Sequence, residues 1–386
     1  MTEKLYYEDS HRKEFDAAVA ACEEAEKGYL VALDRTAFFP EGGGQYADTG
    51  TLGNVNVTDV QEKEGVIWHM TDAPLRVGEA VHGKIDWEKR FESMQQHTGE
   101  HIVSGLVHAR FGYDNVGFHL GSDYCTMDFN GPITKEELRE IEFEANQAVW
   151  HNLGVEVLYP DKETLKDMEY RSKIEIEGQV RIVRVADVDT CACCAPHVKR
   201  TGEIGCIKLV NMVNYKGGER VFMLCGSRAL ADYDRKDGNA KAISAMLCAK
   251  EDDIFEAVRH LKEEQSSLKS KAADLQQQLL AFRAKEIDVS TDVATVFDSS
   301  LTGNGPRELM NCLLSRGAKI AAVFAGSDEG GWRYVIGSQT EDVRPLCGKL
   351  NEAFEGRGGG KPGMVQGSLI GTEEDIRRMC EDYPME

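Results

Sequence analysis

Two pairs of side chains in this sequence have the types and the spacing of metal ligands. His97 and His101 lie four residues apart in QQHTGEH, so on a helix they share one face, one turn apart. Cys193 and His197 are spaced C-x-x-x-H in CACCAPHVKR, where Pro196 favours a turn before the histidine. Zinc accepts Cys sulfur and His nitrogen, commonly four ligands in total. Together the two pairs form a candidate Cys-His₃ zinc site.

The spacing leaves other readings of these residues open. Cys191 and Cys194 are spaced C-x-x-C and are also candidate ligands. The first pair also reads H-x-x-E-H, the inverted zinc-peptidase motif in which the glutamate, here Glu100, is the general base. A peptidase of that type takes its third ligand from a downstream carboxylate, whereas the best downstream cluster here is Cys and His. Without a metal, the histidines would face solvent and the cysteines would be small buried apolar residues.

Two glycine-rich stretches could let the backbone approach a ligand. EGGGQ, residues 41–45, has three consecutive glycines that can take positive φ angles, although a plain hairpin turn would explain the same string. In GRGGGKP, residues 356–362, Arg357 and Lys361 flank glycines whose N–H groups could form an anion nest. The second stretch matches neither the P-loop nor the dinucleotide pattern. It therefore predicts a glycine loop of another kind that binds an anion.

Composition sets the class of protein. The chain has 386 residues, 41% hydrophobic and 29% charged, which suits two or three domains. Eleven scattered cysteines favour a reducing cytosol over a disulfide framework. The polar start and the lack of an apolar run of about 20 residues predict a soluble, cytoplasmic protein with no membrane partner. The net charge of −21 counts against nucleic acid as a partner, although a local basic stripe can exist on an acidic protein.

The elements that must position the ligand pairs lie in the first 235 residues. Residues 1–88 alternate short apolar runs with Gly and Asp turns, which predicts a small β-barrel that carries the first glycine motif. A helix over 89–112 would carry His97 and His101. A further amphipathic helix over 134–152 and several strands complete an α+β zinc-binding domain over 89–235.

The remaining sequence predicts two more parts. Residues 236–283 indicate a helical linker with a coiled-coil seam, because apolar residues recur every seven positions: Ile254, Leu261, Leu268, Leu275 and Phe282. A long amphipathic helix packed on its own domain is the alternative. Residues 284–386 alternate strands and helices, which predicts a C-terminal α/β domain. The overall fold class is α+β.

Six motifs occur in the order found in the alanyl-tRNA editing proteins: FFPEGGGQYADTG, QQHTGEH, VGFHLG, CCAPHVKRTGEIG, YKGGERVFMLCGSRAL and GRGGGKPGMVQG. The chain resembles the long, free-standing AlaX-type form of this family over nearly its whole length. That form is similar to the editing and C-terminal domains of alanyl-tRNA synthetase, without the aminoacylation domain. Where the family usually has CGGTH, this chain has CCAPH.

The resemblance implies a role for each motif. It implies a Zn²⁺ ion held by His97, His101, Cys193 and His197. It implies a substrate site lined by Gly42, Gly43, Gly44, Gln45 and Thr49, with His119 where the synthetases have a glutamine. It implies tRNA contacts in the C-terminal domain, at Arg357, Gly358, Gly359, Gly360 and Lys361. No catalytic residue is assigned, since position 100 is often Gln or Thr in the family, which argues against Glu100 as an obligatory base.

The implied activity is hydrolysis of the ester that joins a wrong amino acid, mainly serine and sometimes glycine, to tRNA(Ala). An apolar pocket for alanine rejects serine only about 10²-fold, whereas a second site that hydrogen-bonds the serine hydroxyl can reject alanine by about 10⁴ or more. Gln45, Thr49 and His119 are the candidate partners for that hydroxyl. The sequence leaves open whether the zinc is catalytic or only shapes the site.

The partners expected are tRNA(Ala) carrying serine or glycine and a second copy of the chain in a homodimer. Lys199 and Arg200 come shortly after His197, beyond Val198, and are expected where the tRNA 3′ end enters. Further basic residues surround the ligand loop in sequence: Lys173, Arg181, Arg184, Lys208 and Lys216. The competing functions are a zinc metallopeptidase of the HxxEH type and a non-catalytic tRNA-binding module with structural zinc.

Overall fold

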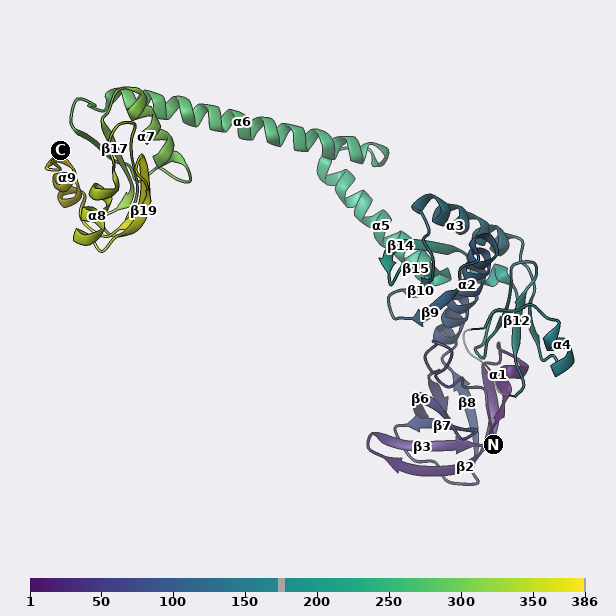
Figure 1. Cartoon of the computed structure of the whole chain (residues 1–386). Coiled ribbons are helices and arrows are strands. Elements are labelled where there is room, and N and C mark those ends of the chain that lie inside the picture. The colour runs from purple at the N-terminus through teal and green to yellow at the C-terminus, as the bar shows by residue number, and fades with distance from the viewer. Residues whose placement is uncertain (173–177, 385–386) are drawn as a thin grey trace. The chain divides into compact units, whose positions relative to one another are not determined.

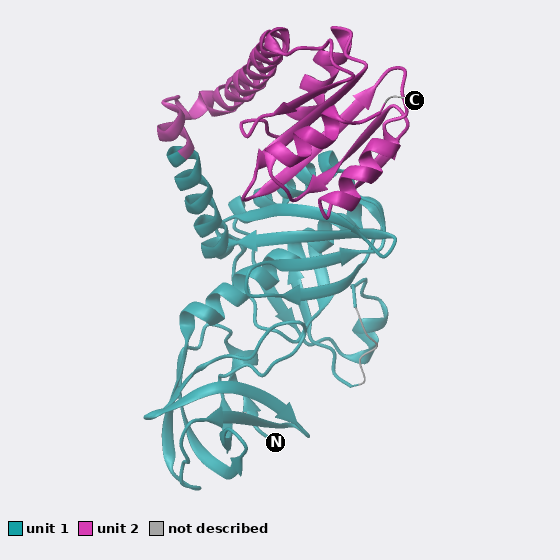
Figure 2. Ribbon diagram, turned by 90° about the vertical axis from the view of Figure 1, so that its left-hand side faces the viewer, with its two compact units in different colours: residues 1–242 teal, residues 243–386 magenta. Residues whose placement is uncertain are grey.

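The computed structural model describes residues 1–172 and 178–384. The chain forms two compact units, Met1–Ala242 and Ile243–Glu386, coloured separately in Figure 2. Each unit has its own hydrophobic cores.

The first unit begins with the expected β-barrel. Its strands are β2 (Glu14–Ala25), β3 (Gly28–Leu33), β5 (Gly50–Leu52), β6 (Val55–Lys63), β7 (Val66–Thr71) and β8 (Ala80–Ile85). They pair in the closed order β2-β3-β7-β6-β5-β8 (Figure 1). Buried and exposed residues alternate along β8, as the pleat of a half-buried strand requires. At the N-terminus, β1 (Glu3–Lys4) pairs with β4 (Arg35–Thr36) and leads into the one-turn helix α1 (Leu5–Glu8).

The predicted helix that carries His97 and His101 is present as α2 (Trp87–Phe111). The side chain of Asp86 caps its first turn by accepting from Lys89 N, and Gly112 ends it at a φ of 70°. The residues of α2 from Met94 to Gly105 are all buried, because the helix packs between other elements on several sides. Its histidines are therefore held in the interior rather than on a solvated face.

A four-stranded antiparallel sheet and a helix cover α2. The sheet has the order β14-β15-β10-β9, from β9 (Asn115–Leu120), β10 (Cys125–Phe129), β14 (Ile207–Tyr215) and β15 (Gly218–Cys225). The helix is α3 (Lys135–Trp150), which begins with a capping box between Thr134 and Glu137. The helix over 134–152 predicted from the sequence is confirmed, and β9 and β10 form an antiparallel hairpin.

A three-stranded sheet brings the second ligand pair toward α2. It consists of β11 (Val155–Leu158), β12 (Ile182–Val185) and β13 (Asp189–Ala192), in that order. The short helix α4 (Lys162–Lys166) follows β11, and the 3₁₀ turn η1 (Thr201–Ile204) follows the loop after β13. Because β13 packs on α2, the CACCAPH loop at its end lies beside the histidines of that helix.

The second unit contains an α/β fold. Helix α5 (Gly226–Leu247) crosses the division between the units, and η2 (Glu251–Asp253) precedes α6 (Ile254–Glu286). The sheet has the order β16-β17-β18-β20-β19, from β16 (Val293–Phe297), β17 (Ile320–Ser327), β18 (Gly331–Ser338), β19 (Arg357–Lys361) and β20 (Met364–Leu369). The helices α7 (Gly305–Ser315), α8 (Arg344–Ala353) and α9 (Glu373–Glu381) cover it. Alternate residues of β17 enter two cores, one built with α8 and α9 and the other with α6 and α7.

The heptad segment predicted from the sequence is a continuous helix, α6. Its Leu280 and Ala284 are buried against α7. Its heptad residues lie on another face and are exposed: Leu261, Leu268, Leu275 and Phe282 are 51%, 58%, 64% and 61% accessible. The long helix is therefore confirmed, and a coiled-coil partner stays a prediction. Among residues 1–172 and 178–384, none of the helices has both the length and the apolar composition needed to cross a bilayer.

Candidate metal centre

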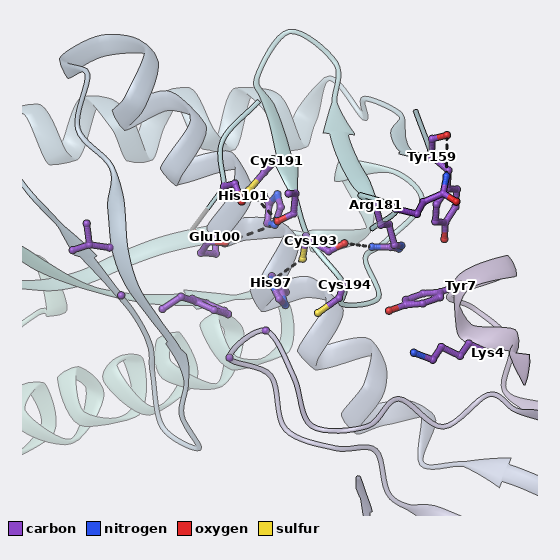
Figure 3. A pocket seen from close by; sticks show the side chains of 18 residues that line it. Lys4, Tyr7, His97, Glu100, His101, Tyr159, Arg181, Cys191, Cys193 and Cys194 are labelled. Atoms are coloured by element: carbon purple, nitrogen blue, oxygen red, sulfur yellow. Dashed lines mark hydrogen bonds and ion pairs between the residues drawn. The ribbon is translucent and has the colours of Figure 1, made fainter. Parts of the chain in front are cut away.

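The four residues proposed as ligands converge in the first unit. His97 and His101 lie one turn apart on α2, and Cys193 and His197 lie in the loop after β13. Their ligand atoms all lie within 4.8 Å of one another. The sulfur of Cys193 is 3.3 Å from Nε2 of His197 and 3.6 Å from Nε2 of His97. Figure 3 shows His97, His101 and Cys193 among the side chains that line a pocket.

The three cysteines of CACC occupy different positions. Cys193 is the cysteine that joins all three histidines. Cys191 is buried in a second group, with His101 and Asp189, and Cys194 is exposed. Cys191 lies within β13, whereas Cys193 and Cys194 follow the end of this strand at Ala192, so the loop sets their positions.

Each histidine of the cluster also has a hydrogen-bond partner at its second ring nitrogen, on the side away from the other ligands. The Nδ1 atoms lie 3.0 Å from an oxygen of a second side chain, in the pairs His97–Gln45, His101–Asp189 and His197–Thr98. These contacts leave Nε2 of each ring directed into the cluster. Histidines that bind metals almost always have such an outer partner, because it fixes the tautomer and the ring orientation. The donor set therefore has the arrangement of a metal site, not only its composition.

The close approach of the ligand side chains shifts the pKa values of two of them. Removal from water would raise the pKa of the Cys193 thiol, but His97 and His197 beside it hold that pKa well below its ordinary value. Burial opposes protonation of His101, yet Cys191 and a hydrogen bond to a carboxylate hold its pKa well above the usual range. The lowered pKa favours the thiolate of Cys193, and a bound cation would offset this charge and displace the proton of His101.

Asp189 supports the cluster and was not identified from the sequence. It is buried, and its carboxylate accepts from Nε and Nη2 of Arg171 at 2.8 and 3.0 Å as well as from His101. Burial alone would raise the pKa of Asp189, but the bonds from His101 and Arg171 hold it below its usual value. The only sequence signal is an acidic residue two positions before the cysteine cluster.

The first glycine motif packs directly on the cluster. Gly43 and Gly44 have φ angles of 61° and 80°, in the left-handed region that favours glycine. A Cβ on Gly44 would lie 2.7 Å from the ring of Phe118, and one on Gly43 would lie 3.2 Å from the sulfur of Cys194. Gly42 closes the turn through paired backbone bonds to Gln45. The glycines are needed because strand β9 and the ligand loop approach the turn so closely.

The polar residues expected around the substrate lie in different places. Gln45 is 1% exposed, and its amide oxygen holds His97 rather than facing the pocket. The hydroxyl of Thr49 contacts Asp86 and accepts from Lys89 at the start of α2. His119 lies on the exposed face of β9 with its ring 5.9 Å from that of Tyr46. Of the predicted substrate residues, Gly43 and Gly44 line the pocket of the ligand cluster.

The pocket over the cluster has a volume of about 740 Å³. Phe118 and Cys194 form part of its wall, and Tyr7, Tyr159 and Arg181 lie farther out. Tyr7 and Tyr159 were not identified from the sequence, because α1 and the segment after β11 are distant in sequence from both ligand pairs. A volume of this size is in the range of small-molecule sites and is much larger than one amino-acid side chain.

Glu100, the glutamate of the HxxEH string, also lines this pocket. One of its carboxylate oxygens accepts from the hydroxyl of Ser104 at 2.8 Å and from the amide of Asn115 at 2.6 Å. The other lies 3.9 Å from Nε2 of His101. The remaining ligands of the cluster are a cysteine and a histidine, and not the carboxylate of the peptidase arrangement.

The basic residues around the ligand loop are mostly paired with protein groups. Lys199 lies 2.9 Å from Asp9, and Arg200 donates to the backbone carbonyl of Asn152. Lys208 and Arg184 each contact a glutamate, and Lys216 lies over the ring of Tyr215. Lys173 lies outside the described residues. Acidic side chains therefore offset Lys199, Lys208 and Arg184, whereas Arg200 and Lys216 contact uncharged groups.

The predicted glycine loop at Arg357 and Lys361 is wrong: these residues form the edge strand β19, paired with β20. None of Gly358, Gly359 and Gly360 has a positive φ, so the backbone does not form a nest. Close packing, and not a positive φ, explains glycine in this strand. A Cβ on Gly358 would lie 2.2 Å from the hydroxyl of Tyr334, which packs against the strand. All five residues of β19 are exposed, so both cations remain at the surface.

Comparison with known proteins places this site in context. Residues 2–89 match the family described as tRNA synthetases class II (A), and residues 180–228 match the threonyl and alanyl tRNA synthetase second additional domain. The alanyl-tRNA editing protein Aarsd1 of Rattus norvegicus is 29% identical over 405 residues, which cover 98% of this chain and 97% of that protein. The alanyl-tRNA editing protein AlaX-L of Pyrococcus horikoshii is 27% identical over 397 residues, 97% of this chain and 96% of that protein.

A larger enzyme contains the same region. The alanine–tRNA ligase of Halorubrum lacusprofundi is 32% identical over 389 residues, which cover 95% of this chain but 42% of the ligase. The second matched family includes the CACCAPH loop, and the near-complete coverage of the two editing proteins extends through the second unit. By sequence, the chain is a homologue of the alanyl-tRNA editing proteins over nearly its whole length.

Proposed function

We propose that the chain is a trans-editing hydrolase that deacylates mischarged tRNA(Ala), chiefly Ser-tRNA(Ala), with Gly-tRNA(Ala) as a second substrate. The observation that carries this proposal is the buried His97, His101, Cys193 and His197 cluster at the floor of a pocket large enough for an aminoacyl nucleoside. The homology to editing proteins supplies the substrate class.

We propose zinc as the metal. A tetrahedral zinc with a Zn–S distance of about 2.3 Å and Zn–N distances of about 2.05 Å has S···N edges of about 3.5 Å. The two S···N distances around Cys193 are 3.3 and 3.6 Å, close to that value. Soft sulfur together with imidazole nitrogen also favours zinc over magnesium or calcium, which prefer oxygen ligands.

When bound, zinc supplies a Lewis acid that can polarise an ester carbonyl or a water molecule. The chain's own residues contribute position. Gln45, Asp189 and Thr98 fix the three imidazole rings. The Gly43–Gly44 turn and Phe118 form a close wall beside the cluster, so an ester bound there is held in one orientation and shielded from bulk water. An aminoacyl ester is already reactive, and such positioning is the main requirement.

The test is deacylation of Ser-tRNA(Ala) and Ala-tRNA(Ala) by the purified protein. We expect release of serine and sparing of alanine, and loss of both activity and bound zinc in a His101→Ala variant. His108→Ala is the matched control, since His108 lies on the same helix but is exposed. Binding of tRNA without release of serine would indicate a non-catalytic module, and cleavage of peptides would indicate a peptidase.

We also propose that tRNA is held partly by the second unit. The resemblance to the synthetase C-terminal domain implies this role, and Arg357 and Lys361 support it, because both are exposed on the edge strand β19. Phosphate contacts by such cations position a nucleic acid without reading its sequence. Tying the tRNA body to one unit would raise the local concentration of its 3′ end at the other.

We further propose a homodimer formed through α6. The support is the exposed heptad face of Leu261, Leu268, Leu275 and Phe282, on a helix whose opposite side already packs on α7. Four large apolar residues in a row on one helix face are the pattern of a coiled-coil seam. Gln265 interrupts the alternate seam, which is how such helices select one register.

A further inference from the structure

The pocket of the ligand cluster continues past Cys194 to three polar side chains that none of the motifs includes. Lys4 and Tyr7 come from β1 and α1 at the N-terminus, and Arg181 comes from the residue before β12. Figure 3 shows the three lying beside one another, with their polar ends turned toward the loop of Cys193 and Cys194. Elements more than 170 residues apart in sequence therefore form one end of the pocket.

Arg181 is the centre of this group. It is 8% exposed, and its Nη1 donates to the carbonyl oxygens of Cys193 and Ala195 at 2.7 and 3.0 Å. Its Nε is buried and has no hydrogen-bond partner among the described residues. The guanidinium lies 5.1 Å from the centroid of the Tyr7 ring. A buried N–H donor of a cation that has no acceptor destabilises the folded state. A ligand with an acceptor oxygen would remove this destabilisation.

Tyr7 and Lys4 add further donors to the same end. The Tyr7 hydroxyl has no hydrogen bond to the described part of the chain, and burial together with Cys194 raises the pKa of Tyr7, so the hydroxyl stays protonated. Nζ of Lys4 lies 5.5 Å from the centroid of the Tyr7 ring and within 2.7 and 2.8 Å of the two oxygens of Glu62. An ammonium has three N–H donors, so Glu62 fixes Lys4 and uses two of them.

We propose that Lys4, Tyr7 and Arg181 bind the phosphate of the substrate's 3′-terminal nucleotide. This inference rests on the proposed editing function. Guanidinium and ammonium groups carry donors and no acceptors, so they select a ligand built of acceptor oxygens, and a phosphate matches this better than a base edge. Glu62 offsets part of the charge of Lys4, which leaves Arg181 and Tyr7 as the main contacts.

The ester and the phosphate of the substrate are separated in the same way as the ligand cluster and the cation group of the pocket. In a terminal aminoacyl nucleotide, the ester is attached to the 2′ or 3′ oxygen and the phosphate to the 5′ oxygen of the same ribose. The ligand cluster and the cation group likewise lie apart in one cavity of about 740 Å³, with Cys194 between them. Binding the phosphate at Arg181 would place the ester over the metal ligands. The group thus positions the substrate for a reaction that it does not itself perform.

The test uses two small substrates that differ by one phosphate: 3′-O-seryl adenosine and 3′-O-seryl adenosine 5′-monophosphate. We expect the zinc-loaded wild-type protein to prefer the phosphorylated ester by about 10- to 100-fold in kcat/KM, as hydrogen bonds to a charged group provide. In Tyr7→Phe and in Lys4→Met this preference should fall by about 3- to 10-fold, through KM of the phosphorylated substrate. Bound zinc, measured by elemental analysis, should equal that of the wild type in both variants.

Tyr233→Phe, an exposed tyrosine on α5, is the matched control and should keep the wild-type preference. An unchanged preference in Tyr7→Phe and Lys4→Met would overturn the inference, and so would a wild-type protein that deacylates Ser-tRNA(Ala) but hydrolyses both small esters equally. A wild-type protein that hydrolyses neither the small esters nor Ser-tRNA(Ala) would overturn the proposed function itself. The two failures are therefore distinguishable.

Discussion

Replacing Gln45 by Leu should weaken zinc binding rather than substrate recognition. Gln45 belongs to the glycine motif, and its type and position suggested a partner for the serine hydroxyl. In the structure its amide oxygen lies 3.0 Å from Nδ1 of His97, and both residues are buried, at 1% and 2% exposure. Leucine has a similar volume and no acceptor. The substitution therefore removes the outer partner of one metal ligand and little else.

The expected magnitude follows from this single contact. A hydrogen bond of this kind contributes about 0.5–1.5 kcal/mol net, and leaving the buried N–H of His97 unpaired costs about 1–3 kcal/mol. Loss of an outer partner typically lowers metal affinity about 10- to 100-fold, equal to about 1.4–2.7 kcal/mol, which agrees with that range. Folding stability should change less, because Nε2 of Gln45 has no hydrogen-bond partner among the described residues and leucine removes this unpaired donor.

The assay is competition for zinc between the protein and a chromogenic chelator, followed by deacylation of Ser-tRNA(Ala) at saturating zinc. We expect a 10- to 100-fold weaker zinc affinity and recovery of kcat/KM to within about threefold when zinc saturates the variant. Thr49→Val is the matched control, since Thr49 shares the motif but contacts Asp86 and Lys89 instead. Unchanged zinc affinity with a lost distinction between serine and alanine would contradict this role of Gln45 and make it a substrate residue.

Three further predictions concern stability and assembly. His69 is buried in the barrel, and burial lowers its pKa to about 4. Between pH 6.5 and 4, His69 is therefore protonated in the unfolded chain and neutral in the folded chain. The free energy of unfolding should fall by about 3 kcal/mol as the pH drops through that window, and urea titrations of His69→Gln should lack this slope. Arg90→Met leaves Asp48 buried and unpaired and should cost about 3–5 kcal/mol in urea unfolding, whereas the double replacement with Asp48→Leu should recover much of it. Leu261→Lys with Leu268→Lys should convert a dimer to a monomer in sedimentation without changing the circular dichroism of the folded domains, and a monomeric wild-type protein would contradict the assignment of α6 as the interface.

Local patterns in the sequence determined several elements correctly. The spacing of His97 and His101 requires a helix to bring both rings to one face, and α2 provides it. The alternating runs of residues 1–88 predicted the barrel, and the heptad repeat predicted the long helix α6. Each of these patterns has a period of two to seven residues. Their periodicity depends on backbone geometry alone, so a short stretch of sequence contains the information.

Tertiary structure decided which side chains meet. Gln45 and His97 are 52 residues apart, and His101 and Asp189 are 88 apart, so no local pattern links either pair. The run of glycines at 358–360 suggested a loop because glycine permits positive φ, yet the strand needs glycine at 358 because Tyr334 packs there and at 360 because the backbone of Met364 lies close. Glycine tolerates both situations, and only the neighbouring chain shows which one applies. The outer part of the pocket joins α1 to the residue before β12 for the same reason: the sequence encodes each element locally, and the packing of distant elements builds the site.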